Sequence, residues 1–236
     1  MRALRIAATV VREIYGCPKF VFTSFYSDYA YQMKKFLTLL FLLASGAAFA
    51  EETIVVCFNY GCIAEATARF SEPRLRTLAK KLRATRSAAE ERKALADVVG
   101  QLYSWAGQQT PVFADRGGNT PDDGVHGAMD CIDHSTTTTR FLKMLERRRM
   151  LRYHEVENIA RRRRFLLFEH YSAVIEELPR SMTPKPADDD RPDFSGQTKP
   201  QRYVVDSWFV NNGKPAVILP LEEWTDGAGP AVEPGL

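Results

Sequence analysis

The sequence predicts an α+β fold in which helices pack on an antiparallel β-sheet. Helical hydrophobic spacing dominates residues 72–149, whereas β-branched and aromatic runs dominate from residue 165 onward. The segment Asn211-Asn212-Gly213 lies between two such runs and is a strong signal for a tight turn joining antiparallel strands. Helices followed by strands in one chain indicate an α+β domain.

Residues 33–50 have the layout of a secretory signal peptide. Two lysines follow Met33, an apolar run comes next, and Ala48-Phe49-Ala50 offers small residues at a cleavage site. The apolar run is shorter than the ~20 residues that cross a bilayer, so we expect no stable membrane anchor after cleavage. We therefore predict a periplasmic or secreted protein. Residues 1–32 do not fit the short start of a signal peptide, and we predict that translation begins at Met33.

Removing residues 1–50 changes the charge of the protein. The whole chain carries 32 Lys and Arg against 29 Asp and Glu, a net charge of +3. Residues 1–50 hold six basic and two acidic side chains, so they account for +4 and leave about −1. A nearly neutral mature chain gives no support to nucleic-acid binding. The remaining region, with 51–224 as its core, suits one domain.

Cysteine usage agrees with export. Cys57 and Cys62 flank the turn sequence Asn59-Tyr60-Gly61, and in an oxidising compartment we expect them to form a disulfide. A metal site is the weaker alternative, because no second Cys or His pair follows at ligand spacing. A redox pair is also disfavoured, since the spacer is longer than in Cys-x-x-Cys. Cys131 is then the one free thiol of the mature chain.

The first part of the mature chain predicts a strand and two amphipathic helices. Ile54 to Phe58 is a short β-branched run that suits an opening strand. Glu72 to Gly107 carries helical spacing, and Ser87 precedes Glu90 at the distance of a capping box. The apolar positions that recur along these helices are Leu75, Leu78, Leu82, Leu95, Val98, Val99, Leu102 and Trp105.

A loop rich in Gly, Asp, Asn and Pro spans Gln108 to Met129 and leads into Cys131. Cys131 is expected in the first turn of a helix that ends near Arg149. Unpaired N–H groups at a helix start favour a thiolate over a thiol. The neighbouring Asp130 and Asp133 oppose the thiolate, although a negative charge also suits a helix first turn.

Two later strands are expected to supply a base and a carboxylate. The run Phe165–Ile175 contains His170, and the run Tyr203–Val210 contains Asp206. Alternate residues of a strand share a face, so adjacent strands would make His170 and Asp206 cross-strand neighbours. The histidine would take the proton of Cys131, and the aspartate would fix the ring by accepting its other N–H.

Cysteine, histidine and aspartate together suit attack on an amide carbonyl through a thioester. The developing oxyanion would meet the backbone N–H of Cys131, with His126 as a weaker candidate for the second donor. Taken singly, each of the three residues has a structural explanation. Cys131 suits a small buried hydrophobe, His170 a hydrogen-bonded core histidine and Asp206 a turn cap.

The motifs Gly127-x-x-Asp130-Cys131-x-Asp133, His170-Tyr-Ser-Ala-Val174 and Tyr203-Val-Val-Asp206 occur in this order. As a set they resemble the transglutaminase-like branch of the papain-like fold, and are particularly similar to bacterial transglutaminase-like cysteine proteinases. The resemblance covers about Ser87 to Trp224. The chain departs from the pattern in the two residues between His170 and Ala173, and in the polar insertion Ser181–Pro200.

The resemblance implies a papain/transglutaminase-like core with the nucleophile at a helix N-terminus. Matched residue by residue, it places the nucleophile at Cys131, the base at His170 and the orienting acid at Asp206. It implies a peptide or protein amide substrate and no metal or cofactor. We expect hydrolysis rather than transfer to an amine, because nothing in the sequence marks an amine acceptor site.

The alternative function is a non-catalytic envelope binding module that keeps this fold. The Gln108–Met129 loop or the arginine clusters at 147–149 and 161–164 would then hold a partner. A solvated helix end and strand edge are the favoured explanation of these arginines, because the mature chain is nearly neutral. We also expect a disordered tail from Thr225 to Leu236.

Overall fold

A computed structural model describes residues 51–118, 122, 124–164, 168–179 and 200–230. The predicted N-terminal extension, the signal peptide, all but the last residue of the Ser181–Pro200 insertion and the end of the tail lie outside these ranges. The described residues belong to one compact unit.

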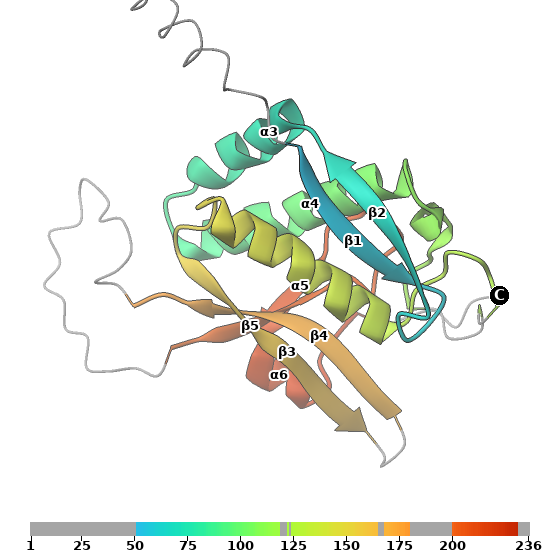
Figure 1. The fold of residues 1–236 in the computed structure, drawn as a ribbon. Coiled ribbons are helices and arrows are strands. Elements are labelled where there is room, and N and C mark those ends of the chain that lie inside the picture. The colour runs from blue at the N-terminus through green and yellow to red at the C-terminus, as the bar shows by residue number, and fades with distance from the viewer. Residues whose placement is uncertain (1–50, 119–121, 123, 165–167, 180–199, 231–236) are drawn as a thin grey trace, which may run out of the picture. The chain divides into compact units, whose positions relative to one another are not determined.

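The described chain combines helices with antiparallel sheet, which confirms the α+β prediction. Figure 1 shows the elements, which are β1 Glu52–Phe58, β2 Ala64–Phe70, α3 Glu72–Arg83, α4 Ala88–Gly107, η1 Pro111–Ala114, α5 Cys131–Arg147, β3 His154–Arg164, β4 Phe168–Glu177, β5 Arg202–Asp206, β6 Val217–Pro220 and α6 Leu221–Thr225.

The strands form two antiparallel sheets. One pairs β1 with β2, and the other has the order β3-β4-β5-β6. In the larger sheet, Ala173 lies opposite Val205 and Val174 lies opposite Val204. Continuing this register makes His170 and Asp206 diagonal neighbours, two residues out of direct opposition, which is within reach of a long side chain.

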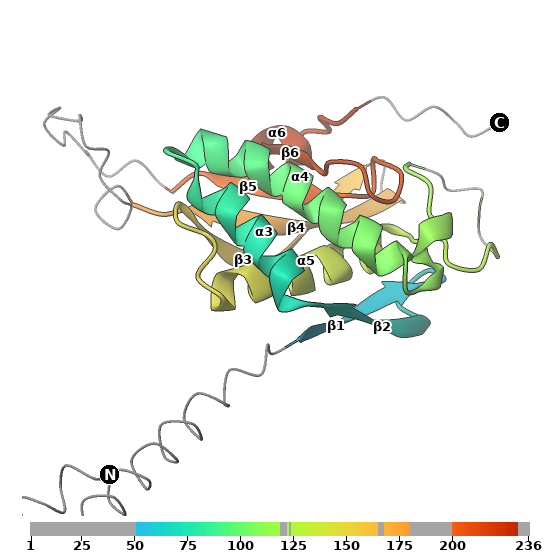
Figure 2. The ribbon, with the colours of Figure 1, turned by 90° about the horizontal axis from the view of Figure 1, so that it is seen from above.

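The larger sheet has helices on both faces (Figure 2). Ala173 and Val205 join the main core together with buried residues of α4 and α5. Val174 and Val204 point the other way and pack with Trp224 of α6. Side chains therefore alternate between an α5-facing side and an α6-facing side of β4 and β5. Within the part of the chain that the structure describes, no helix combines the length and apolarity needed to span a bilayer.

The predicted helices are confirmed at α3, α4 and α5, and the Ser87 side chain accepts from the Glu90 N–H at 3.2 Å. Strand β2 was not predicted, because Ala64–Phe70 alternates short alanines with polar residues and lacks the β-branched pattern. The strand expected over Tyr203–Val210 ends at Asp206 and gives way to a turn.

The predicted disorder of the tail from Thr225 is wrong for residues 225–230. Thr225 completes α6, and Arg162 donates to the backbone carbonyl of Ala228 at 2.8 Å. Buried hydrogen bonds of this kind hold a segment that its polar composition alone would leave free.

The loop that precedes Cys131 is tightly packed at Gly127. This glycine has a φ of +95°, and a Cβ atom there would overlap the backbone carbonyl of Pro111 in η1. Its N–H donates to the Asn59 side chain at 2.8 Å. The loop is therefore irregular, as predicted, but its conformation next to the helix start is fixed by neighbours.

Gly127→Ala should destabilise the fold strongly. An alanine is strained at this positive φ, and its Cβ would also clash with Pro111. Gly124→Ala is the matched control, with a φ of +94° and nothing within 4 Å of its would-be Cβ. We expect a loss of about 1–2 kcal/mol in unfolding free energy for the control and about 3 kcal/mol or more for Gly127→Ala. Denaturant unfolding measures both, and equal losses would contradict the close packing.

Candidate active site

Cys131 is the first residue of α5, as the sequence predicts. Asp130 caps the helix: its Oδ1 accepts the N–H of Ile132 at 3.0 Å and that of Asp133 at 2.9 Å. The Asp133 carboxylate completes the capping box by accepting the Asp130 N–H at 3.2 Å. The N–H of Cys131 lies at the positive end of the helix, where it favours the thiolate form of its own side chain.

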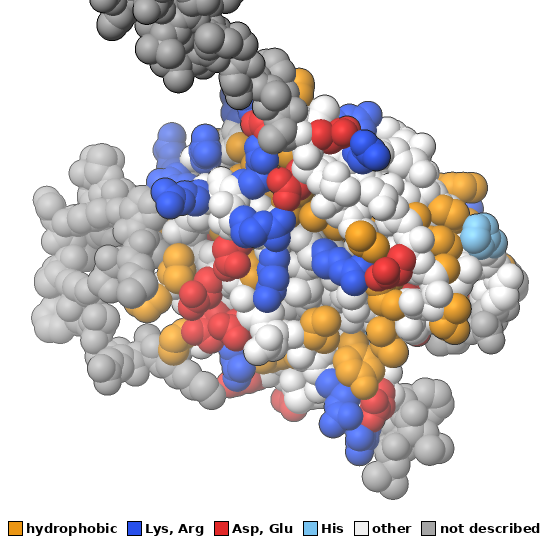
Figure 3. Space-filling model, in the orientation of Figure 1, with side chains coloured by type: hydrophobic (Ala, Val, Ile, Leu, Met, Phe, Trp, Pro, Cys, Tyr) orange, Lys and Arg blue, Asp and Glu red, His pale blue; other side chains and the backbone are white. Residues whose placement is uncertain are grey.

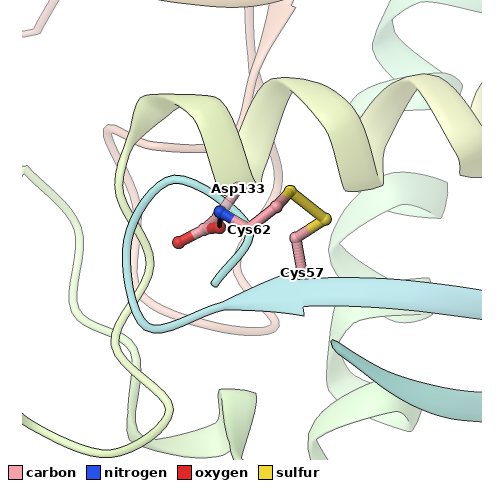
Figure 4. Close-up of side chains that lie close together, drawn as sticks. All are labelled: Cys57, Cys62 and Asp133. Atoms are coloured by element: carbon pink, nitrogen blue, oxygen red, sulfur yellow. Dashed lines mark hydrogen bonds between the residues drawn. A yellow bond between two sulfur atoms is a disulfide. The ribbon is translucent and has the colours of Figure 1, made fainter. Parts of the chain in front are cut away.

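A disulfide turn is docked on this helix start. Cys57 and Cys62 are bonded, as predicted, at an S–S distance of 2.13 Å. Asp133 accepts the N–H of Tyr60 at 2.8 Å and that of Cys62 at 2.6 Å. Figure 4 shows the Asp133 side chain reaching the backbone of the turn from α5. Because the N–H of Gly61 also donates to Asp130 at 2.9 Å, the turn provides hydrogen bonds to both carboxylates that flank Cys131.

Cys57, Cys62 and Asp133 also have the donor types of a metal site, and their ligand atoms lie within 4.8 Å of one another. Both sulfurs are engaged in the disulfide, however, and thiolate is the form that binds metal. The Asp133 oxygens already accept backbone N–H groups. The arrangement therefore supports the disulfide over the metal alternative.

The Asp133 carboxyl is fully buried. Burial, with a contribution from neighbouring Asp130, raises its pKa from 3.8 to about 6, against the opposing effect of the N–H donors. Its ionised form therefore depends on the N–H groups of the disulfide turn.

The Cys131 sulfur lies against β4, next to the residue that carries the predicted base. Sγ is 3.9 Å from the carbonyl oxygen of Glu169. Burial raises the pKa of the thiol to about 11, and the charges of Asp130 and Asp206 add to the effect. The N–H groups of Tyr171 and of Cys131 itself act in the opposite direction. The resting thiol is therefore protonated at neutral pH.

His170 and Asp206 are hydrogen-bonded, with 2.7 Å between Nε2 and Oδ2. The carboxylate also accepts the indole N–H of Trp224 at 2.9 Å and the backbone N–H of Trp208 at 3.2 Å. Asp206 is almost fully buried and acts as an acceptor in all three bonds. Nε2 must therefore carry the proton, and the lone pair of neutral His170 lies on Nδ1.

Three aromatic rings surround the His170 imidazole. The ring centroid of Trp208 lies 4.8 Å away, and those of Phe209 and Trp224 lie 5.6 Å away. These rings limit the access of water to the His170–Asp206 hydrogen bond and favour one ring orientation.

The structure thus brings the three predicted residues to one end of the sheet. His170 projects from the α6-facing side of β4, where it meets Trp224. Cys131 approaches the same strand from α5, and its sulfur interacts with the backbone of Glu169 and Tyr171, on either side of His170. No hydrogen bond joins the Cys131 sulfur to the imidazole among the described residues.

His126, the weaker candidate for an oxyanion donor, is exposed and packs against the disulfide turn. Its ring contacts Phe58 with 5.5 Å between centroids, and its Nδ1 lies 3.4 Å from the Asn59 side-chain nitrogen. No contact with Cys131 is described. These interactions tie His126 to the β1–β2 turn and give it a structural role.

The arginine clusters are largely paired within the protein. Arg147 and Arg148 bind Glu52, and Arg161 and Arg163 bind Glu169. On the face shown in Figure 3, basic and acidic side chains lie next to one another. This pairing favours the interpretation as a solvated surface over a site for an anionic partner.

Sequence reasoning missed two parts of the site. Trp224 is fully buried and donates to Asp206, yet in the sequence it stands alone among polar residues. His134 is buried between Asp115 and Ser207, which come from a loop and from the end of β5. Neither partnership has a local sequence signal, because its members are 18 to 73 residues apart.

Comparison with known proteins gives no relative. No protein-family model, curated protein or solved structure matches the chain significantly.

Trp224→Phe should destabilise the protein, because it removes a donor from the buried Asp206 carboxylate. Trp208→Phe is the control: its indole N–H has no described hydrogen bond, and its backbone N–H is unchanged by the substitution. We expect Trp224→Phe to lower the unfolding free energy by about 1–3 kcal/mol more than the control does. Denaturant titrations compare the two, and a smaller loss at Trp224 would contradict the proposed hydrogen bond.

Asp130→Asn should lower the pKa of Cys131, because it removes one of the charges that raises it. Asparagine caps helices as well as aspartate, so α5 should keep its start. We expect the midpoint of Cys131 alkylation against pH to fall by up to about one unit. Asp97→Asn, on the remote helix α4, is the control and should leave the midpoint in place. A higher midpoint in Asp130→Asn would show that other effects govern the thiol.

Proposed function

We propose that the protein is an exported thiol hydrolase that cleaves amide bonds through a Cys131 thioester. The observation that supports it most is the part-buried His170–Asp206 hydrogen bond of 2.7 Å, in which His170 comes from the strand that the Cys131 sulfur contacts. A base held by its orienting acid is one half of such a site, and the proposal requires the His170 imidazole and the Cys131 sulfur, which contact β4 from different sides, to meet when substrate binds. We also propose a papain/transglutaminase-like arrangement of the core, which fits the order of helix, strand and strand.

The proton of Cys131 leaves during attack rather than beforehand. Because the resting thiol is protonated at neutral pH, the site holds no ready-made thiolate. His170 accepts the thiol proton on Nδ1 as sulfur bonds to the amide carbonyl carbon. The proton then passes to the leaving amine, and Asp206 stabilises the imidazolium that forms in between.

The oxyanion of the tetrahedral intermediate faces the N–H of Cys131 at the helix start. This donor is aligned with the helix dipole, and in the resting protein it interacts with the Cys131 sulfur itself. Water then attacks the thioester carbonyl, with His170 removing its proton, and the acid product leaves while the thiol is restored. No metal or cofactor enters this sequence of steps.

The substrate we propose is a peptide or protein amide outside the cytoplasm. The Cys57–Cys62 disulfide is compatible with an oxidising compartment. Hydrolysis is proposed over transfer to an amine because nothing in the sequence marks an amine acceptor site.

A second candidate is a non-catalytic envelope module with the same fold. Two observations favour it: the raised pKa of Cys131, and a sulfur that touches the β4 backbone rather than the imidazole. A thiol without a base reacts only through its thiolate, which would be scarce below pH 9 for a pKa of about 11.

Alkylation with iodoacetamide at pH 7 separates the two functions. For the hydrolase, we expect His170-assisted labelling of Cys131, and His170→Ala should slow it by about 10²-fold. Cys131→Ala should abolish both labelling and the hydrolysis of peptide amides. Mass spectrometry of the tryptic peptide measures the rate at Cys131 itself.

His126→Ala serves as the matched control for loss of an imidazole and should label at the rate of the unmodified protein. Equal rates for His170→Ala and the unmodified protein, with reactivity that rises only toward pH 11, would establish the non-catalytic alternative.

A further inference from the structure

The end of β5 is held from both faces of the sheet. Asp206 points toward α6 and binds His170 and Trp224. The next residue, Ser207, points toward α5, where its Oγ lies 2.8 Å from Nδ1 of His134. His134 lies one turn after Cys131 in the same helix. Asp206, the last residue of β5, and Ser207, which follows it, thus meet two different imidazoles.

Ser207 belongs to a buried chain of hydrogen bonds. Its Oγ lies 2.9 Å from Oγ1 of Thr138, which lies 3.0 Å from the Tyr103 hydroxyl. The Tyr103 hydroxyl donates to the backbone carbonyl of His134 at 3.2 Å. All four residues are buried. The chain joins α4, α5 and the end of β5 through directional bonds, which specify a position more narrowly than apolar packing does.

Asp115 completes the cluster on the other side of His134. Its Oδ2 lies 3.1 Å from Nε2 of His134, close enough for an ion pair, although the pair lacks good hydrogen-bond alignment. Oδ1 accepts the N–H of Met129 at 3.0 Å, and the backbone carbonyl accepts the N–H of Asn212 at 3.3 Å. Asp115 therefore ties His134 to the residues just before Cys131 and to the turn after β5.

The cluster contains a serine, a histidine and an aspartate, but it is not a second hydrolytic site. The exposed fractions of Ser207, His134 and Asp115 are 4%, 3% and 0%. A substrate carbonyl cannot reach a hydroxyl so enclosed, and Ser207 is already hydrogen-bonded to Thr138.

Charge explains why a histidine occupies this position. Burial by itself lowers the pKa of His134. Three carboxylates raise it, Asp115 most strongly and then Asp206 and Asp133, and together they outweigh burial, so the pKa lies above its usual value. These carboxylates come from the loop, β5 and α5, and the facing residue of α4 is Tyr103, whose pKa burial raises. The three carboxylates thus favour the protonated form of His134.

We propose that His134 is a positioning residue and counter-charge of the thiol site, joining the helix start that carries Cys131 to the strand end that carries Asp206. As an imidazolium it forms an ion pair with Asp115 and donates from Nδ1 to Ser207. It offsets the negative charge around Cys131, to which Asp206 contributes. A role of His134 in catalysis rests on the proposed hydrolase function. Its effect on the pKa of the Cys131 thiol does not.

The test replaces His134 by glutamine in the full mature chain. Glutamine is neutral, so we expect the pH midpoint of Cys131 alkylation to rise by about one unit. Labelling that proceeds through the thiolate should be roughly tenfold slower below that midpoint. Ser207→Ala is the matched variant that removes the hydrogen bonds of this hydroxyl to His134, Thr138 and Tyr103 and keeps the charge. It should lower the unfolding midpoint but shift the alkylation profile much less. Near-UV circular dichroism checks that each variant is folded.

A folded His134→Gln protein with the unmodified pH profile would overturn the counter-charge. A measurement that needs no variant is the NMR titration of the His134 ring in the unmodified protein. We expect its midpoint to lie above the ordinary value of about 6.5, and a midpoint below it would also overturn the inference, even if His134→Gln does not fold.

The outcome is distinguishable from that of the proposed function. A protein that hydrolyses no amide but shows the His134-dependent shift in Cys131 alkylation would retain this inference and lose the hydrolase. A protein that hydrolyses amides with an unshifted His134→Gln profile would do the reverse.

Discussion

The structure around Cys131 depends on the start of α5. The carboxylates of Asp130 and Asp133 pair the N–H groups that a helix start leaves open, and they also hold the disulfide turn through the N–H groups of Tyr60, Gly61 and Cys62. Asp130, one of the two carboxylates that fix the helix, also makes a thiolate at its first residue less favourable. Structural capping and nucleophile activation therefore compete at one helix turn.

Groups from other parts of the fold offset the negative charge at this helix turn. Backbone N–H groups of the disulfide turn engage Asp133, and the imidazole of His134 lies among Asp115, Asp133 and Asp206. The thiol remains protonated even so. A site of this kind suits chemistry in which the base removes the proton as the bond to sulfur forms.

The end of β5 serves as the second fixed point. Asp206 binds its histidine on one face of the sheet, and Ser207 binds another on the opposite face. Strand alternation imposes this division, because successive side chains point to opposite sides. Movement of the strand end relative to α5 would disturb both pairs at once. The buried indole of Trp224 and the N–H of Trp208 further restrict the carboxylate.

Much of the fold and part of the site were predictable from local patterns. Helical spacing, the cap at Ser87 and the helix start at Cys131 are short-range features, so the sequence alone predicts α3, α4 and α5. The spacing of Cys57 and Cys62 predicts their bond, and strand periodicity puts His170 and Asp206 within reach of each other. Their catalytic roles remain proposals.

The sequence by itself determined which residues carry reactive groups and which elements hold them, because periodicity and capping act over a few residues. Only the tertiary structure decided that Trp224 binds Asp206, that His134 lies between Asp115 and Ser207, and that the Cys131 sulfur lies against the β4 backbone. Those contacts join segments that are distant in the sequence, and burial at these contacts shifts the pKa of the titratable side chains. Burial is a property of the packed molecule, which no local pattern contains.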